Sequence, residues 1–204
     1  MNIQKATLAV FTVLLFAVTA CSSSPEPEPT PTPIPAATAI AATVDTTAET
    51  SPSLAPVFSV SNIDGENVRL EDLLGVVPVY LVFVPTTSDD LDRVQLEQIQ
   101  SQIEQFNEMD AEVVVVVSEL PTRVIDSRDE LGLDFSLIAD PLDVVASDWQ
   151  VFDLNNDGES NPASFVFDAH GSLIARLIAA EPGDRPTIDE VLSVIEESLS
   201  VGAA

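Results

Sequence analysis

Cysteine and histidine are nearly absent from this sequence of 204 residues. The single cysteine, Cys21, leaves no possibility of an internal disulfide, a CxxC redox pair or a cysteine-rich zinc site. The single histidine, His170, has no second histidine with which to form a metal pair. We expect His170 to lie at an exposed hairpin turn, where it cannot serve a Ser-His-Asp triad.

Positive charge is also scarce. Lys5 is the only lysine, and the formal net charge is −27. A nucleic-acid-binding protein displaces counterions from phosphates with lysine and arginine, and this chain has few of either. We therefore expect no nucleic-acid partner. No Walker loop and no GxGxxG pattern is present either.

What the chain does contain begins with an apolar segment at residues 6–20. It is shorter than the ~20 residues that a membrane-spanning helix needs, but it fits the apolar region of a secretory signal. The segment ends at Val18-Thr19-Ala20-Cys21, which resembles the lipobox of bacterial lipoproteins. That resemblance implies a signal peptide over residues 1–20, cleavage before Cys21 and acylation of that residue. It also implies membrane lipid as a partner and a location at the extracytoplasmic face of a bacterial membrane. An ordinary secretion signal is the alternative.

Residues 21–56 are rich in proline, alanine and threonine. Alternating prolines from Pro25 to Pro35 favour an extended polyproline II rod, and we expect a disordered tether. A folded domain is predicted over residues 57–199, followed by a short tail at 200–204.

Apolar runs and helical repeats alternate within the predicted domain, which indicates an α/β fold. The runs predict strands at 58–60, 68–70, 76–84, 113–117, 135–138, 163–167 and 173–178. The 3.6-residue periodicity predicts helices at 92–109, 122–131, 142–151 and 187–199. Trp149 lies among apolar residues, and we expect it in the core.

Four segments carry a resemblance to a known family. They are Ala55-Pro56-Val57-Phe58-Ser59-Val60 with Asp64-Gly65 and residues 70–75, the strand 79–84 with Pro85, residues 131–141, and Asn161-Pro162-Ala163-Ser164-Phe165-Val166-Phe167. In this order they resemble the peroxiredoxin-like alkyl hydroperoxide reductase/thiol-specific antioxidant family of the thioredoxin superfamily. The resemblance implies a three-layer, thioredoxin-like fold with a central mixed sheet flanked by helices. It also implies peroxidase or thiol oxidoreductase activity, and a cis-proline at Pro162 facing the active site.

The residues of the family's active site do not carry over. After Pro85, the positions of the family's hydroxyl and cysteine residues hold Asp89 and Asp92, and the position of its supporting arginine holds Asn161. Peroxide reduction needs a thiolate that is oxidised and then reduced again, and a carboxylate has no such chemistry. The aspartates stand where a helix should begin, so they can cap its amides and meet its dipole. A carboxylate cation site and a contact with a partner are the alternatives.

A second candidate site follows the pattern D-x-N-x-D-G. Asp153, Asn155, Asp157 and Glu159, with Gly158 at the turn, match the beginning of a calcium loop. The twelfth position, where a bidentate glutamate should complete the loop, holds Ser164. The site would bind Ca²⁺ weakly, or the segment is an ordinary turn of Asn, Asp and Gly residues.

These observations favour a membrane-anchored, redox-inactive relative of the peroxiredoxins that acts as a binding or scaffolding module for an unknown protein partner. A peroxidase or thiol oxidoreductase is one alternative, and a calcium-dependent binding module is another. No cofactor is expected beyond the possible weak Ca²⁺.

Overall fold

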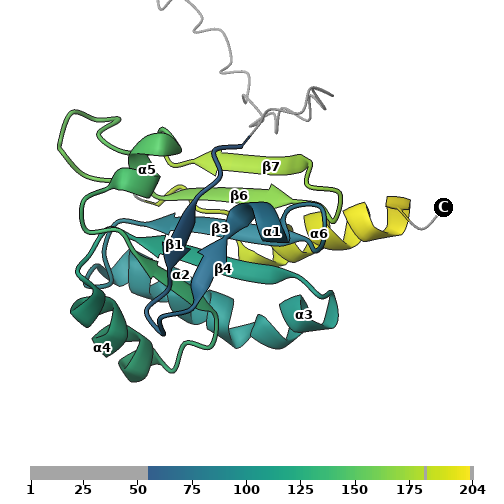
Figure 1. The fold of residues 1–204 in the computed structure, drawn as a ribbon, viewed down its shortest axis with the longest axis horizontal. Coiled ribbons are helices and arrows are strands. Elements are labelled where there is room, and N and C mark those ends of the chain that lie inside the picture. The colour runs from purple at the N-terminus through teal and green to yellow at the C-terminus, as the bar shows by residue number, and fades with distance from the viewer. Residues whose placement is uncertain (1–54, 182, 203–204) are drawn as a thin grey trace, which may run out of the picture. The chain divides into compact units, whose positions relative to one another are not determined.

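A mixed five-stranded sheet forms the centre of the domain in the computed structural model, which describes residues 55–181 and 183–202 (Figure 1). The strand order is β5-β4-β3-β6-β7. The strands are β3 (Val79–Val84), β4 (Glu112–Val117), β5 (Ser136–Ala139), β6 (Ala163–Phe167) and β7 (Leu173–Ile178). β3, β4 and β5 are parallel, whereas β6 is antiparallel to both β3 and β7. The α/β, thioredoxin-like fold predicted from the sequence is confirmed.

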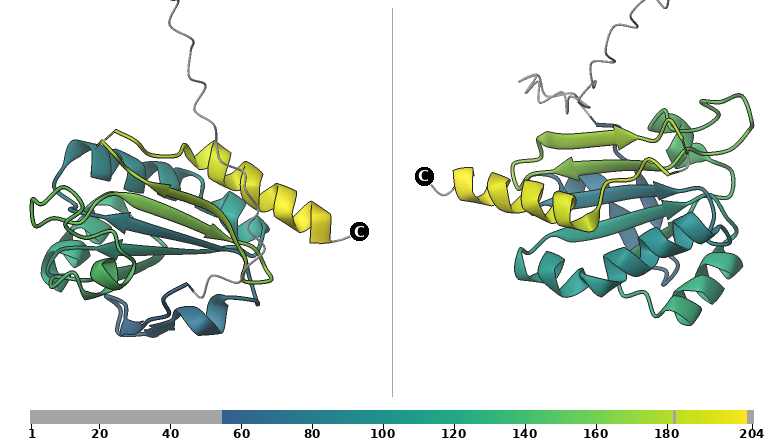
Figure 2. Two further views of the ribbon diagram at one scale, coloured as in Figure 1. Left: turned by 90° about the horizontal axis from the view of Figure 1, so that it is seen from above. Right: turned by 180° about the vertical axis from the view of Figure 1, so that it is seen from behind.

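Elements on both faces of the sheet complete three layers (Figure 2). One face is covered by α2 (Asp90–Ser101), α3 (Ile103–Glu108), α4 (Pro121–Leu131) and α6 (Ile188–Gly202). The other face is covered by a hairpin of β1 (Ser59–Ser61) and β2 (Asn67–Arg69), by α1 (Leu70–Leu73) and by α5 (Val144–Asp148). The predicted hairpin is therefore present, with β1 and β2 antiparallel.

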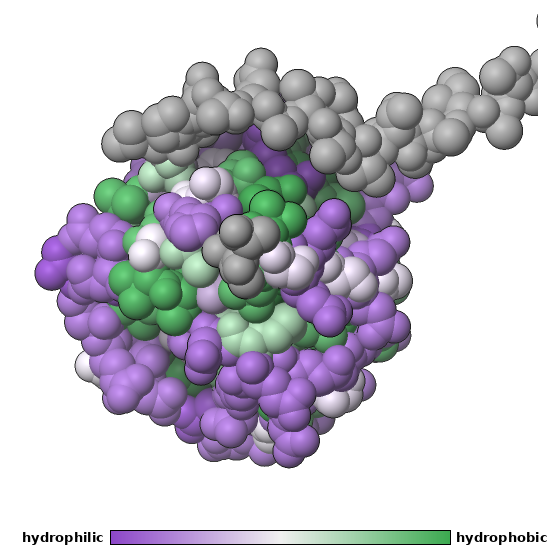
Figure 3. All heavy atoms as spheres, turned by 90° about the vertical axis from the view of Figure 1, so that its right-hand side faces the viewer, coloured by the Kyte–Doolittle hydropathy of each residue, from purple (hydrophilic) through white to green (hydrophobic). Residues whose placement is uncertain are grey.

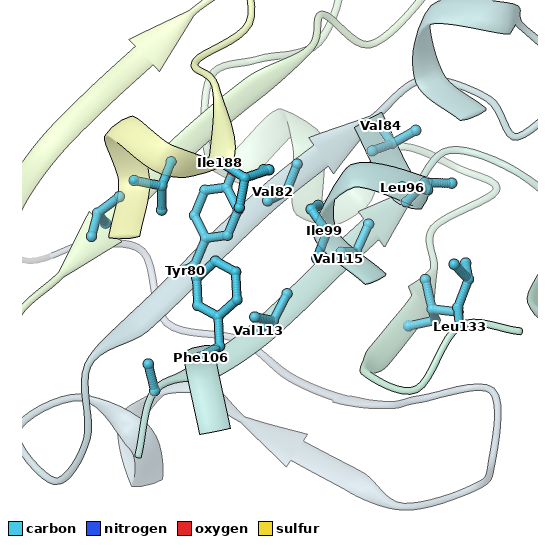
Figure 4. Close-up of a cluster of buried hydrophobic side chains, with 14 of the residues drawn as sticks. Tyr80, Val82, Val84, Leu96, Ile99, Phe106, Val113, Val115, Leu133 and Ile188 are labelled. Carbon is cyan, nitrogen blue, oxygen red and sulfur yellow. The ribbon is translucent and has the colours of Figure 1, made fainter. Parts of the chain in front are cut away.

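Strand β3 supplies both cores because successive side chains of a strand point to opposite faces. Tyr80 and Val82 point into the core beneath α2, α3 and α6, where the Tyr80 and Phe106 rings stack with centroids 5.7 Å apart (Figure 4). Leu81 and Phe83 point into the opposite core. All six residues of β3 are buried, as expected for a central strand with helices on one face and packed elements on the other.

Trp149 lies in this second core, as predicted, with 5% of its surface exposed. Its ring centroid lies 4.7 Å from that of Phe165, 5.7 Å from that of Phe83 and 6.2 Å from that of Phe167. The aromatic cluster fills the space between the sheet and α5.

The predicted helix over residues 92–109 is in fact two helices, α2 and α3, joined at Gln102. Gln102 has ψ 13°, outside the α-helical range, and its amide donates to the carbonyl of Ile99, three residues back. The hydroxyl of Ser101 donates to the carbonyl of Gln98 at 2.8 Å. The apolar periodicity, which continues from Leu96 and Ile99 to Ile103 and Phe106, does not reveal this break.

Other boundaries differ for local reasons. The predicted helix 142–151 is only Val144–Asp148, because Asp143 before it and Gln150 after it have left-handed φ values of 53° and 56°. The predicted strand 76–84 begins at Val79, after a proline that has no amide hydrogen to donate. α6 continues to Gly202, into the segment predicted as a tail.

The carboxyl ends of β3, β4 and β5 lie at one edge of the sheet, to the left in Figure 1, because these strands are parallel. The start of β6 and the end of β7 lie at the same edge, since Ala163 pairs with both Phe83 and Ile178. Ligands of open α/β sheets bind outside the carboxyl ends of the strands. We call this side of the domain the loop edge.

At the opposite edge the β6–β7 turn packs against the turn that follows α1. A Cβ atom added at Gly171 would lie 3.1 Å from the backbone nitrogen of Gly75, and φ at Gly171 is +80°. His170 is exposed at this turn, as predicted. Within residues 55–181 and 183–202, no helix is long and apolar enough to cross a membrane.

Candidate functional site

The segment that follows β3 at the loop edge contains the predicted site residues. Pro85 is partly buried, and Asp89 is the N-cap of α2, with its Oδ1 accepting from the amide of Leu91 at 2.8 Å. Asp90 and Asp92 occupy the first helical turn, where the helix dipole favours negative charge. The interpretation of Asp89 as a helix cap is consistent with this geometry.

Asp92 differs from its neighbours because its side chain is only 3% exposed. It forms an ion pair with Arg185, from the segment between β7 and α6, whose side chain is 12% exposed. The amide of Thr86 lies 3.3 Å from Asp92 Oδ2 as a second donor. The position that the resemblance assigns to a cysteine therefore holds a buried, ion-paired carboxylate.

Burial raises the pKa of Asp92 to about 6, because the charged form loses its hydration. Arg185 and the Thr86 amide favour the charged form and Asp89 opposes it, but burial has the largest effect. Asp92 is therefore predominantly charged at neutral pH and takes up a proton in mildly acidic solution.

Arg185 was not predicted from the sequence. The resemblance places the family's arginine at the position of Asn161, which is 93% buried and packs against the residue that follows β7. The Asn161 amide donates to the Val151 carbonyl at 2.7 Å, and its side-chain nitrogen lies 3.5 Å from the Ala179 carbonyl. The Pro162 carbonyl accepts from the Ala179 amide at 2.9 Å. In the sequence, Arg185 is notable only because cationic residues are few: the chain has six arginines and one lysine.

A second polar cluster surrounds Glu119, which follows β4. Its carboxylate accepts from the Thr86 hydroxyl at 2.7 Å, from the Thr87 amide at 3.0 Å and from the Thr87 hydroxyl at 2.5 Å. Ser127 of α4 donates to the Thr87 hydroxyl at 2.7 Å. Burial alone would raise the pKa of Glu119, but these hydrogen bonds outweigh it and hold the pKa below its ordinary value. The cluster ties the start of α2 to α4.

An open cleft of about 340 Å³ lies beside this cluster. Its lining residues are Thr87, Ser88, Arg93, Arg123, Asp126, Ser127 and Glu130. Arg93 is already paired with Glu130, with Arg93 Nη2 2.8 Å from Glu130 Oε1. Asp92 is not among the lining residues, so the cleft does not give onto the carboxylate at the family's cysteine position.

The residues of the calcium-loop pattern lie together in the exposed loop before β6. Asp153 Oδ1 accepts from the Gly158 amide at 2.8 Å, and Asp157 Oδ1 accepts from the Glu159 amide at 3.1 Å. Ser164, at the twelfth position, lies in β6. In the part of the chain that the structure describes, no group of three or more acidic, histidine or cysteine side chains is arranged to hold a metal ion. Asp153 and Asp157 therefore each stabilise the turn through one carboxylate oxygen, and calcium binding by this loop stays a prediction.

Cys21 and the predicted signal peptide and tether lie outside the described residues, apart from Ala55 and Pro56.

Comparison with known proteins agrees with the fold and its order of elements. Residues 53–176 match the model of the AhpC/TSA family, and the chain belongs to that family. A Mycobacterium tuberculosis protein provisionally assigned as a peroxiredoxin is 28% identical over 135 residues, which cover 63% of this chain and 85% of that protein.

Solved peroxiredoxin structures share the fold. The reduced 2-Cys peroxiredoxin of Plasmodium vivax superposes with a TM-score of 0.63 at 19% identity, covering 74% of this chain and 96% of that one. Peroxidoxin BcpB of Mycobacterium tuberculosis superposes with a TM-score of 0.62 at 19% identity, covering 70% and 94%. The resemblance predicted from the sequence is confirmed at the level of family and fold.

Proposed function

We propose that this chain is a redox-inactive member of its family that acts as a binding or scaffolding module. The ion pair between Asp92 and Arg185 carries the proposal. A peroxidase needs a thiolate at this position, whereas a buried carboxylate held by a guanidinium has no sulfur to oxidise. The sole cysteine of the sequence, Cys21, is the residue that we expect to be acylated.

We further propose that acylated Cys21 holds the domain at the extracytoplasmic face of a bacterial membrane, with residues 21–56 as the tether. The lipobox-like sequence before Cys21 supports this location. Intact-mass analysis of the membrane fraction tests it. The expected product begins at Cys21 and carries acyl chains, and the Cys21→Ser variant should lack them. A chain that retains residues 1–20, or that begins at another residue without lipid, would contradict the anchor.

Peroxide consumption separates the binding module from a peroxidase. The full chain is incubated with hydrogen peroxide or an organic hydroperoxide, using dithiothreitol or thioredoxin as the reductant. We expect no turnover above the buffer blank, and the same result for Cys21→Ser. Turnover that persists in Asp92→Ala would show that the domain reduces peroxide by another route and would end the proposal.

Peroxidase activity is the second candidate, because the chain belongs to a family whose similar structures include 2-Cys peroxiredoxins. In this case Cys21 would have to act as the thiol. Turnover that disappears in Cys21→Ser would favour this candidate over the binding module.

A further inference from the structure

Three loops at the loop edge expose large apolar side chains. Leu120 after β4 is 60% exposed, Leu142 and Val144 after β5 are 81% and 57% exposed, and Leu154 in the loop before β6 is 47% exposed. We call these four residues the apolar rim. Singly exposed apolar residues are ordinary, whereas exposed apolar residues that gather in one region are candidates for an interaction site.

The loops of the rim are held together by side-chain hydrogen bonds. The Ser118 hydroxyl donates to Ser160 Oγ at 2.7 Å, and the Ser160 hydroxyl donates to Asp143 Oδ1 at 2.6 Å. Ser118 lies two residues before Leu120, and Asp143 lies between Leu142 and Val144. Ser160 closes the loop of Leu154 through a bridge with Phe152. The apolar rim is therefore a preformed surface, for which binding costs little ordering entropy.

The charged residues near the rim indicate which kind of partner could bind there. Residues 118–120, 140–144 and 152–160 contain six acidic residues and no lysine or arginine. Asp153, Asp157 and Glu159 are exposed, Glu119 and Asp143 are partly buried, and Asp140 is buried. The nearest arginine along the chain, Arg123, follows Leu120 by three residues and is also exposed. A second copy of this chain, with a net charge of −27, would be repelled, as would a surface of anionic lipids. A partner with lysine or arginine beside aliphatic anchors would match both the apolar surface and its acidic border.

We propose that the apolar rim docks a basic segment of a partner protein, with leucine-like side chains packed against Leu120 and Leu142. The proposal rests on the function proposed above and specifies the chemistry of the partner. The acidic border would speed association and weaken with salt, while the apolar contacts would supply most of the affinity.

A synthetic peptide of alternating leucine and lysine is the probe, and its binding to the full chain is measured by fluorescence anisotropy. Burial of a leucine contributes about a tenfold change in affinity, so Leu120→Ser with Leu142→Ser should weaken binding about 100-fold. A glycine–lysine peptide and a leucine–glutamate peptide should each bind at least about tenfold more weakly.

The opposite edge of the domain, which faces the viewer in Figure 3, supplies a control. Val76, before β3, and Val201, near the end of α6, are 70% and 73% exposed, and Val76→Ser with Val201→Ser should leave the affinity unchanged. The inference would be overturned if both double variants lost the same affinity, or if the rim variant lost none. It would also be overturned if the leucine–glutamate peptide bound as tightly as the leucine–lysine peptide, or if the chain self-associated through the rim.

Peroxide turnover in the same wild-type sample keeps the two proposals apart. If the chain reduces peroxide and also binds the peptide through the rim, the redox-inactive assignment fails and the docking inference stands. If the chain shows no turnover and does not bind the peptide, the docking inference fails and the redox-inactive assignment stands.

Discussion

Replacing one or the other partner of the buried ion pair should change the free energy of unfolding in opposite directions, and both changes should depend on pH. Its two members are Asp92 and Arg185, whose side chains are 3% and 12% exposed. Asp92→Asn removes the buried negative charge but retains an oxygen that can accept from Thr86 and Arg185. Arg185→Met removes the positive charge and leaves the carboxylate buried without this partner.

The magnitude follows from the pKa of Asp92, which burial raises from 3.8 to about 6. The folded state binds this proton more tightly than the unfolded state. The corresponding stability is therefore fully present below pH 3.8 and is lost as the pH rises through about 6. At 1.36 kcal/mol per pH unit the loss is about 3 kcal/mol, and about 2 kcal/mol after an allowance for solvent screening.

Asp92→Asn should consequently be about 2 kcal/mol more stable than the wild type at about pH 7.5, and this advantage should narrow to about a third at about pH 4.5. Arg185→Met should lose about 3 kcal/mol at about pH 7.5, because breaking a buried pair leaves an unpaired charge. Its loss should be smaller at about pH 4.5, where Asp92 is protonated.

Urea unfolding of each variant against the wild type at the same pH measures these differences and cancels the titration of the other carboxylates. The double variant completes a thermodynamic cycle and isolates the coupling between the two side chains. If Asp92→Asn were less stable than the wild type at about pH 7.5, the ion pair would be net stabilising and the reasoning from burial would be refuted.

Two further predictions concern local geometry. Gly171→Ala should destabilise the domain by about 2–3 kcal/mol, because φ is +80° and the new Cβ would lie 3.1 Å from Gly75 N, whereas Gly65→Ala, at φ +84° with nothing within 4 Å, should cost about 1 kcal/mol. If denaturant unfolding gave the same loss of stability for both variants, the close contact at Gly171 would contribute nothing. Calcium should change neither the Tm nor the calorimetric heat, in the wild type or in Asp157→Ala, because the residues that the structure describes contain no group of three or more acidic, histidine or cysteine side chains placed to hold a metal ion. A Tm that rises with Ca²⁺ in the wild type alone would instead establish the loop as a calcium site.

The sequence predicted the central strands well, because burial on both faces leaves a continuous apolar run. The five valines of β4 and the run that becomes β3 are examples. It predicted the extent of the helix after β3 less well, since the break at Gln102 involves neither glycine nor proline.

The candidate site was predictable only in part. The position of Asp92 follows from its spacing after Pro85, but its ion pair with Arg185 joins residues 93 positions apart in the sequence. Such a contact depends on the tertiary arrangement of α2 and the segment before α6, which local pattern does not specify. The exposed leucines of the apolar rim are likewise inconspicuous in the sequence, because their loops come to one edge only through the pairing of β3 with parallel β4 and antiparallel β6 and of β4 with β5.

The two faces of the sheet have separate natural chromophores. Tyr80, the only tyrosine, is buried in the core beneath α2, α3 and α6, and Trp149, the only tryptophan, is buried in the core beneath α5. Because the indole absorbs at longer wavelengths than the phenol, Trp149 can be excited alone and its emission reports the core beneath α5 without any added label. Tyr80 emission reports the other core together with its energy transfer to Trp149. Coincident fluorescence transitions would show that the two layers melt as one cooperative unit, and separated transitions would show which layer yields first.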